Sequence, residues 1–480
     1  MIQKHFIFTI SFILALAIFA SCEKEDDESL FEEKQNVAAT PSEGSSKSAE
    51  EQKGVMESTG ITLNDELTSI SKSESMEASV SFAYHLTHMD EDPLKSNYKA
   101  FQKTEAFNII QAINELDNDE KSVTDFMAEL KQNDWEPESA TEIYDSLSGK
   151  YTWDTDKESW TVTENEKIIF EFPSKKGGDS NDAVFVVESV SETKLDDYYY
   201  FGEGSWNEEP EESYKGYVPT GLHFYLEVGE DKSMEYKYTA SFNGEGFLKE
   251  ASVDFSLGSL SYLTEFKNNN SQEISSTTTL KNGEKKLIEF GAGIQGDISQ
   301  DNIENSIQYR AYNEETYRDT IISAEDTSKY DYYYPEPDPK ELLNEGFAYF
   351  SILDKIKLGG KVAIKDLIKA EEDIYPLNYW DNPDFDSNQA TNDWAAALNE
   401  HTDLFVANME ENKWMAKANF YVKEETDYNE TYSYVALHFK FSDESKVDPE
   451  TYFGEGFDDL IKNFNTSMKE VESAYSSYDL

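Results

Sequence analysis

Three oxygen-bearing side chains at alternating positions form the first candidate site, a site for calcium. Asp384, Asp386 and Asn388 have the one-three-five spacing that lets side-chain oxygens converge on one cation. The segment is not an EF-hand, because Gln389 replaces the required glycine and Ala395 replaces the bidentate glutamate. Capping of the following helix by these side chains is the alternative interpretation. Calcium is the only cofactor that the sequence suggests.

Two tyrosine clusters flanked by acidic residues are candidates for ligand contact. The first contains Tyr198 and Tyr199, and the second contains Tyr332 and Tyr333. Exposed tyrosine rings offer flat apolar surfaces to a sugar ring, and neighbouring carboxylates accept hydrogen bonds from its hydroxyls. These clusters therefore predict contact with a neutral glycan, while loop packing and edge-strand packing are the alternative.

Two other patterns match functional motifs only in part. His85 and His88 are three residues apart, a spacing that places both imidazoles on one helix face, but no cysteine or nearby third histidine completes a zinc site. We expect a capped or solvent-facing pair. Residues 291–296 satisfy GxGxxG, yet they follow a predicted hairpin meander and not the first strand of a βαβ unit. A glycine-rich turn of a sheet is the expected structure there.

Motifs for nucleophilic or metal-dependent catalysis are absent from the sequence. We find no GxSxG, HExxH or phosphate-binding P-loop, and no cysteine–histidine pair. Glycoside hydrolysis needs only two carboxylates. The chain has 98 acidic residues, and the sequence does not identify which two of them would form a catalytic pair. The sequence favours binding over catalysis and leaves a glycoside hydrolase as an alternative.

The N-terminal residues have the pattern of an export signal. Lys4 precedes an apolar run from residue 6 to residue 20, which is too short to span a bilayer but suits a signal peptide. The run ends in Ala20-Ser21-Cys22, which resembles a bacterial lipobox and holds the only cysteine of the chain. We predict removal of residues 1–21 and lipidation (palmitate) of Cys22, with an ordinary secretory signal as the alternative.

The residues after Cys22 resemble the acidic export tag of Bacteroidetes surface lipoproteins. Residues 23–28 read Glu-Lys-Glu-Asp-Asp-Glu. The chain as a whole is similar to uncharacterised outer-membrane lipoproteins of that group. This resemblance implies anchoring in the outer membrane through the lipid on Cys22, with the body exposed at the cell surface. Asp145-Ser146-Leu147 and Asp319-Thr320-Ile321 resemble the O-glycosylation sequon of the same bacteria and mark Ser146 and Thr320 as glycosylation candidates.

The overall charge limits the classes of partner. The chain has 480 residues with 98 acidic and 41 basic side chains, and its formal net charge is −57. Nucleic acid is excluded as a partner, because such a surface repels phosphates. An aromatic content of 14% argues against a wholly disordered chain.

Periodicity predicts an α+β fold that is mainly an antiparallel β meander, with N-terminal helices and a C-terminal helix-strand-strand-helix segment. Apolar residues alternate in Leu222–Val228, and Asn282-Gly283 marks a hairpin. Helical spacing predicts helices at residues 106–116 and 123–130, at Trp394–Phe405 and, most clearly, at Phe457–Val471. The expected segments are a signal peptide (1–21), a disordered acidic tether (22–55), a helical region (56–135), a β-rich domain (136–326), a Tyr/Pro-rich linker (327–340) and an α+β C-terminal domain (341–480).

Together these features predict a surface-anchored, non-catalytic binding module for a neutral glycan or a protein ligand. One alternative is a periplasm-facing carrier that holds a lipid or apolar ligand in a curved sheet. The other is the glycoside hydrolase with unmarked carboxylates.

Overall fold

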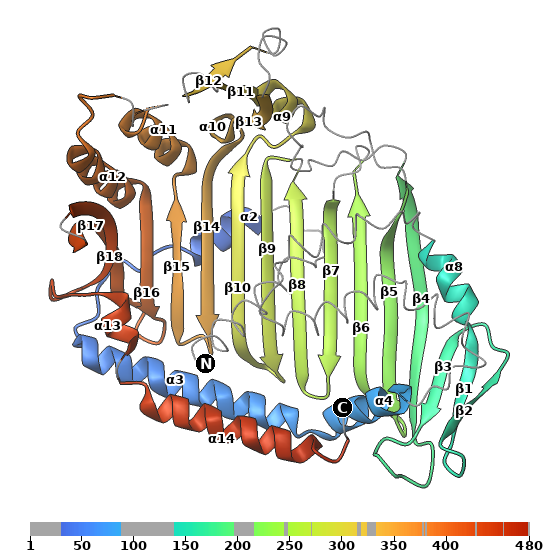
Figure 1. Cartoon of the computed structure of the whole chain (residues 1–480). Helices are drawn as coiled ribbons and strands as arrows, with labels where there is room; N and C mark the ends of the chain where they lie inside the picture. Colours follow the sequence, from blue (N-terminus) through green and yellow to red (C-terminus); the bar gives the residue numbers. More distant parts are fainter. Residues whose placement is uncertain are drawn as a thin grey trace.

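A computed structural model of the chain describes residues 30–87, 139–195, 216–243, 248–269, 271–313, 318–323, 333–376, 379, 382–427, 430–454 and 456–478. Figure 1 shows one wide sheet with helices along its border and on its faces. The described helices are α2 (Leu30–Val37), α3 (Ala49–Ser71), α4 (Glu74–Thr87), α8 (Ala140–Leu147), α9 (Gln300–Ser306), α10 (Pro339–Leu342), α11 (Ile364–Ile374), α12 (Ser387–His401), α13 (Pro449–Gly454) and α14 (Asp458–Tyr475).

The first strands of the chain are β1 (Gly149–Asp154), β2 (Ser159–Thr163), β3 (Ile168–Phe172), β4 (Ala183–Leu195), β5 (Gly216–Val228), β6 (Asp231–Phe242), β7 (Leu248–Leu257), β8 (Leu260–Asn269), β9 (Glu273–Asn282) and β10 (Lys285–Gly296). The later strands are β11 (Ile307–Asn313), β12 (Arg318–Ile322), β13 (Tyr333–Pro337), β14 (Leu343–Ile352), β15 (Ile356–Val362), β16 (Thr402–Asn408), β17 (Lys413–Asp427), β18 (Glu430–Phe441) and β19 (Lys446–Val447).

Sixteen of the described strands form a single sheet in the order β19-β18-β17-β16-β15-β14-β10-β9-β8-β7-β6-β5-β4-β3-β1-β2. All neighbours pair antiparallel except β1 and β3. The predicted α+β class with a long antiparallel meander is therefore confirmed. The predicted hairpin at Asn282-Gly283 joins β9 to β10, and Gly283 has a positive φ of 56°.

The two faces of the sheet differ in chemistry because side chains alternate along each strand. One cross-strand row carries Phe224, Tyr236, Phe255 and Tyr262, and we call that side the apolar face. The adjacent row carries Tyr225, Glu235, Ser256 and Ser261, and we call that side the polar face.

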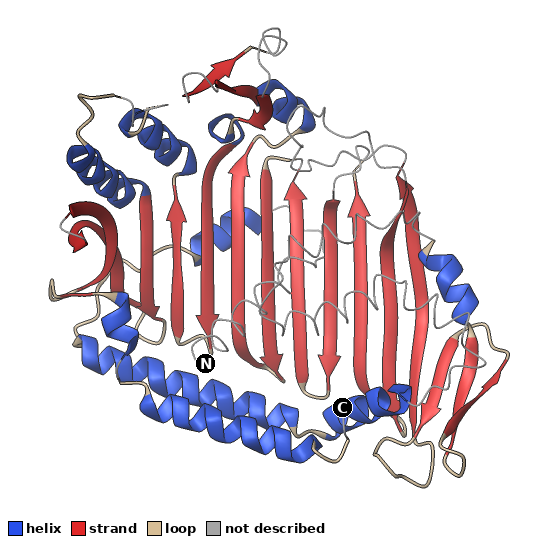
Figure 2. Cartoon of the chain, in the orientation of Figure 1, coloured by secondary structure: helices blue, strands red, loops and turns tan. Residues whose placement is uncertain are grey.

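Helices α4 and α3 cover one end of the apolar face. Phe82 of α4 stacks on Phe172 and Phe185, with ring centroids 5.0 and 4.4 Å apart. Ile70 of α3 belongs to the same buried cluster as Leu287 of β10. Helix α14 lies side by side with α3, and together with α4 they form a row along the strand ends (Figure 2).

The segment 22–55 was predicted to be a disordered tether, but its described part, residues 30–55, is folded and contains α2 and the start of α3. Helix α2 lies on the polar face, where Val37 and Ala38 pack on Phe347 and Tyr349. The amino group of Lys357 donates a hydrogen bond to the Val37 carbonyl at 3.1 Å. Phe347 and Tyr349 are apolar exceptions on the polar face, and packing of α2 and Ala38 removes their apolar surface from water.

The start of α3 has a capping box that the sequence interpretation overlooked. The Ser48 side chain accepts a hydrogen bond from the Glu51 backbone, and the Glu51 carboxylate accepts one from the Ser48 backbone at 2.8 Å. This signal places the beginning of the helix at Ala49, inside the segment predicted to be disordered.

The GxGxxG segment lies inside strand β10 and not in a turn as expected. A Cβ atom at Gly291 would lie 2.3 Å from the Tyr349 ring, and one at Gly293 would lie 2.6 Å from the Phe347 ring. Both glycines face these aromatic residues across the β10–β14 pair. The motif therefore serves close packing of aromatic rings on the sheet.

The Tyr/Pro-rich segment does not interrupt the main sheet. Its described part forms β13, an edge strand of a separate sheet with the order β12-β11-β13, and then the start of α10. Pro335 and Pro337 are tolerated there because an edge strand has an outer side that needs no donors. Strands β10 and β14, on either side of this segment in the chain, are hydrogen-bonded neighbours.

The predicted C-terminal end of the helix at Trp394–Phe405 was wrong. Helix α12 ends at His401, and Leu404 and Phe405 belong to β16. Phe405 lies opposite Gly359 of β15, so pairing with a distant strand decides its conformation. The helices predicted at residues 106–116 and 123–130 lie outside the described residues.

Candidate ligand-binding surface

The residues proposed to bind calcium surround the start of α12. Asp386 is its N-cap, and its carboxylate accepts hydrogen bonds from the backbones of Asn388 at 3.1 Å and Gln389 at 3.0 Å. The Asn388 side-chain oxygen accepts a hydrogen bond from Ser433 of β18 at 2.9 Å, and Asp384 is exposed. Among the described residues no group of three or more His, Cys, Asp or Glu side chains could hold a metal ion. Capping describes this segment, and calcium binding stays a prediction.

The other candidate residues are dispersed over the molecule. Thr320 is exposed on β12, Ser146 lies in α8, and Tyr333 lies in β13. The structure does not bring these three into a common site. The remaining candidates lie outside the described residues: Cys22, Tyr198, Tyr199, Tyr332 and His88.

His85 is a core residue and not the solvent-facing residue that was one expectation. Its side chain is 2% exposed, and Nδ1 lies 2.7 Å from the Ser81 carbonyl oxygen. Its ring packs edge-on against Trp153, with centroids 4.7 Å apart. Hydrogen bonding inside its own helix allows the imidazole to be buried.

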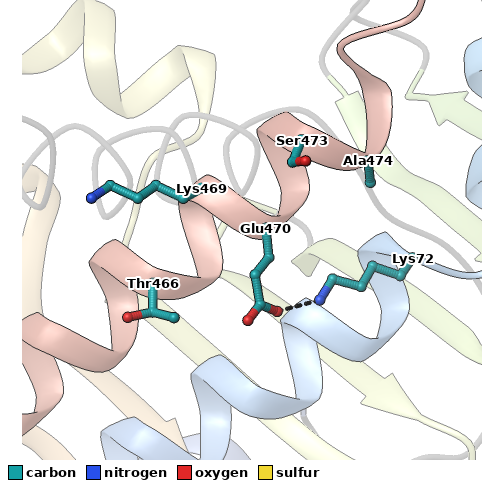
Figure 3. A pocket seen from close by; sticks show the side chains of 6 residues that line it. All are labelled: Lys72, Thr466, Lys469, Glu470, Ser473 and Ala474. Carbon is teal, nitrogen blue, oxygen red and sulfur yellow. Dashed lines mark hydrogen bonds and ion pairs between the residues drawn. The ribbon is translucent and has the colours of Figure 1, made fainter.

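A pocket among the described residues lies between α3 and α14 and is open to solvent (Figure 3). Lys72, the C-cap residue of α3, and Glu470 of α14 form an ion pair across it. Its lining is Lys72, Thr466, Lys469, Glu470, Ser473 and Ala474. These side chains offer no apolar enclosure for a lipid, so the pocket is a surface depression where two helices meet.

The arrangement best suited to ligand contact lies on the polar face of β17 and β18. In the antiparallel register Tyr432 lies opposite Glu425, and Tyr434 lies opposite Lys423. Alternation along β18 places Tyr432 and Tyr434 on the same side of the sheet. We call these four residues the tyrosine–carboxylate surface.

The Glu425 carboxylate organises this surface. It accepts hydrogen bonds from the hydroxyls of Tyr434 at 2.7 Å and Tyr432 at 3.2 Å, and it pairs with the Lys423 ammonium at 3.0 Å. The hydrogen bond from Tyr434, followed by that from Lys423, lowers the pKa of Glu425 below its usual value. The hydrogen bond to Glu425 in turn raises the pKa of Tyr432. The Tyr432 phenol therefore stays protonated, and the hydrogen bonds to Glu425 give both hydroxyls a fixed direction.

The two rings form a short row in which Tyr432 is exposed and Tyr434 is half-buried. Their centroids are 6.1 Å apart, and the ring planes are inclined by 30°. Tyr432 is 49% exposed, which is unusual for a large aromatic side chain. The row therefore offers neighbouring flat surfaces, with a carboxylate and an ammonium beside them.

A second aromatic pair continues this face of the hairpin. The rings of Tyr421 and His438 lie 4.6 Å apart, and the Tyr421 hydroxyl donates a hydrogen bond to Asp448 at 2.9 Å. His438 is 6% exposed, and its Nε2 atom has no hydrogen-bond partner among the described residues. Burial, assisted by Lys446, lowers the pKa of His438, so the imidazole is neutral near pH 7.

The polar face carries another charged cluster, centred on Glu235 of β6. This carboxylate meets Lys232 at 2.8 Å, His223 at 2.9 Å and Lys237 at 3.0 Å. The hydrogen bond from Lys232, with those from Lys237 and His223, lowers the pKa of Glu235 to about 2. A carboxyl held ionised in this way cannot act as a general acid near neutral pH, and we interpret the cluster as a cross-strand ion network.

Sequence reasoning missed the tyrosine–carboxylate surface because it looked for consecutive tyrosines. The available signal was Tyr432-Ser433-Tyr434, an alternating pair that shares one face of a strand. The position of Glu425 opposite this pair follows from the β17–β18 register.

Comparison of the chain with protein-family models, with curated proteins and with solved structures gave no match. None of the described helices combines the length and the hydropathy needed to cross a membrane. Function must therefore be inferred from the residues and their geometry.

Proposed function

We propose that this chain is a lipid-anchored, non-catalytic binding protein of the bacterial cell surface that holds a neutral glycan on the tyrosine–carboxylate surface. The observation that carries the proposal is the ring pair of exposed Tyr432 and half-buried Tyr434, both of whose hydroxyls donate hydrogen bonds to Glu425. Apolar faces of sugar rings stack on such aromatic rings, and sugar hydroxyls bond to the neighbouring charged groups.

Electrostatics support a neutral ligand. The chain has a net charge of −57, which repels uronic acids and sulfated sugars. The one cation of the surface, Lys423, is already paired with Glu425. A neutral sugar is not repelled by this charge, and stacking and hydrogen bonding contribute to its binding free energy.

The chemistry of Glu425 supports binding over hydrolysis. A glycosidase needs a carboxyl whose pKa is raised so that it can protonate the leaving oxygen. The pKa of Glu425 is shifted downward, by Tyr434 and Lys423. The surface therefore holds a permanent hydrogen-bond acceptor.

The cell-surface part of the proposal rests on the N-terminal sequence. Cys22 follows the apolar run and precedes the acidic residues 23–28. Buried acyl methylenes contribute about 0.8 kcal/mol each, so several chains on one cysteine hold a protein firmly in a membrane.

Glycan binding is tested with the full-length protein in detergent on an array of neutral and anionic polysaccharides. We expect neutral glycans to be retained and the double variant Tyr432→Ala/Tyr434→Ala to lose at least about tenfold in affinity, which corresponds to about 1.4 kcal/mol. The matched control is Tyr217→Ala on β5, whose side chain is 45% exposed. Equal affinity of the double variant and the wild type, or retention of anionic glycans alone, contradicts the proposal.

Surface display is tested by protease treatment of intact cells that produce the wild type or a Cys22→Ala variant. We expect the protease to remove the wild-type protein while the cells stay intact. Degradation only after lysis contradicts surface display and favours the periplasmic alternative.

A further inference from the structure

In the part of the chain that the structure describes, the outer edge of β18 is unpaired along most of its length. Strand β18 spans Glu430–Phe441, yet its outer neighbour β19 has only two residues and pairs with Phe439 and Lys440. Among the described residues no strand pairs with residues 431–437 on that side. In the strand order of the sheet, only the two-residue strand β19 lies beyond β18.

The direction of the free backbone groups follows from the hairpin to β19. The Phe441 N–H donates to Ser445, and the Phe441 carbonyl accepts from Glu444, so the backbone groups of Phe441 point outward. The β17–β18 register has no bulge, and backbone direction alternates along an antiparallel strand. Ser433, Val435 and Leu437 therefore present their N–H and C=O groups outward.

The composition of this edge is unusual for the chain. Residues 431–437 read Thr-Tyr-Ser-Tyr-Val-Ala-Leu and contain no charge, proline or glycine, although 29% of the whole chain is charged. Soluble proteins normally protect edge strands with charges, prolines, bulges or short length. At the opposite border, β2 is protected by its length of only five residues. The edge of β18 lacks these protections.

We propose that residues 431–437 of β18 bind an extended peptide segment of a partner protein as an additional antiparallel strand, and that this segment has an uncharged centre flanked by Lys or Arg. Main-chain hydrogen bonds to Ser433, Val435 and Leu437 supply the pairing. This site is separate from the proposed glycan surface, because it uses backbone groups at the border and not the rings of Tyr432 and Tyr434.

Charge selects a basic partner over a second copy of this chain. Acidic side chains outnumber basic ones on both flanks of the edge. One flank has Glu424 and Glu425 against Lys423, and the other has Asp443, Glu444 and Asp448 against Lys440 and Lys446. A second copy brings another net charge of −57, whereas Lys or Arg at the ends of a peptide complements both flanks.

The test uses the full-length protein and a labelled, terminally blocked peptide Lys-Thr-Val-Thr-Val-Thr-Val-Lys. We expect saturable binding that weakens at least tenfold when both lysines are replaced by glutamate or when alternate amides are N-methylated. Hydrogen exchange read at single residues should slow at Ser433, Val435 and Leu437 on binding. The amides of Tyr434 and Ala436, which face β17, should exchange slowly with or without peptide.

Two variants separate edge pairing from other modes. Val435→Pro removes one outward N–H and leaves the groups that face β17 intact, so the fold should persist while peptide affinity falls at least tenfold. Ala436→Lys adds a positive charge on the polar face and should weaken the basic peptide without removing a backbone group. The double variant Tyr432→Ala/Tyr434→Ala should still bind the peptide through its backbone, so loss of glycan binding is distinguishable from loss of this site.

Three results overturn the proposal. One is undiminished peptide binding by both Val435→Pro and Ala436→Lys. Another is slow exchange at Ser433, Val435 and Leu437 in the free protein, which shows that the edge is already covered. The third is a concentration-dependent dimer that Val435→Pro abolishes, which makes a second copy the occupant.

Discussion

On the apolar face, the rings of Tyr236 and Tyr262 lie among other strand side chains, and burial raises the pKa of both phenols, that of Tyr236 to about 12. On the polar face, Tyr432 is 49% exposed and donates its hydroxyl to Glu425. All three tyrosines come from strands of the same sheet. For these three residues, the position on the sheet and not the residue type decides whether the tyrosine is buried in the fold or meets solvent.

The same contrast holds for the forces on each face. Stacked rings such as Phe82, Phe172 and Phe185 hold the helices against the apolar face by removing area from water. The polar face is held by networks such as that of Glu235, which is partly solvated and therefore contributes less. One buried patch on the polar face, under α2, combines both kinds of interaction.

The largest expected effect is on the apolar face. Phe172→Ala removes a fully buried ring and should lower the free energy of unfolding by about 3–5 kcal/mol, measured by urea denaturation. Leu263→Ala on the polar face, where the side chain is 37% exposed, is the control and should cost less than about 1 kcal/mol. Equal losses of unfolding free energy for the two variants would contradict the proposed energetic difference between the faces.

The buried patch under α2 should give an intermediate effect. The Tyr349 hydroxyl donates to Glu289 at 2.8 Å, and Lys286 pairs with the same carboxylate. Burial raises the pKa of Glu289, but the hydrogen bonds from Lys286 and Tyr349 outweigh burial and lower it. Tyr349→Phe removes one donor from a buried carboxylate and should cost about 1–3 kcal/mol in urea denaturation. Tyr217→Phe is the exposed control, and a loss no larger than in this control contradicts the role given to Tyr349.

A pH dependence should distinguish the buried histidine of the polar face. The pKa of His438 is lowered in the folded protein, so below about pH 6.5 the unfolded chain takes up a proton that the folded chain resists. Stability should therefore fall as the pH drops from 7.5 to 5, with at most about 1.4 kcal/mol per pH unit from this group. His438→Phe should give a flatter profile of unfolding free energy against pH. Parallel profiles for variant and wild type would show that burial of this imidazole has no energetic consequence.

The smallest expected effect concerns α3, the helix that covers the apolar face. Gly54 is exposed on α3, and an added Cβ would meet nothing within 4 Å, so Gly54→Ala should stabilise by about 0.5–1 kcal/mol. At Gly60, where α14 packs against α3, a Cβ atom would lie 2.8 Å from the Leu460 side chain. Gly60→Ala should therefore gain less than Gly54→Ala in thermal unfolding. A larger gain at Gly60 contradicts the close packing of α14 on α3.

Much of the strand content could be predicted because it depends on local alternation. Leu222–Val228 and the hairpin at Asn282-Gly283 lie where the pattern indicates, as does the amphipathic helix α14. The docked helix α2 could not be predicted, because its stability comes from Phe347 and Tyr349, about 310 residues later in the chain. Eight residues without tertiary contacts do not make a stable helix.

The candidate surface shows the same division. The alternating tyrosines of β18 are visible in the amino-acid order, since a strand places every second side chain on one face. Their shared acceptor, Glu425, is supplied by the register of β17 against β18.

The amino-acid order alone specified the strand periods and the acidic composition, and it carries the prediction of an N-terminal lipoprotein signal, because each depends on neighbours in the chain or on composition. Tertiary structure decided that β10 lies beside β14, that Gly291 makes room for Tyr349, and that no described strand pairs with most of the outer edge of β18. The physical reason is that the free energy of a strand pair belongs to two segments at once, and neither segment specifies its neighbour.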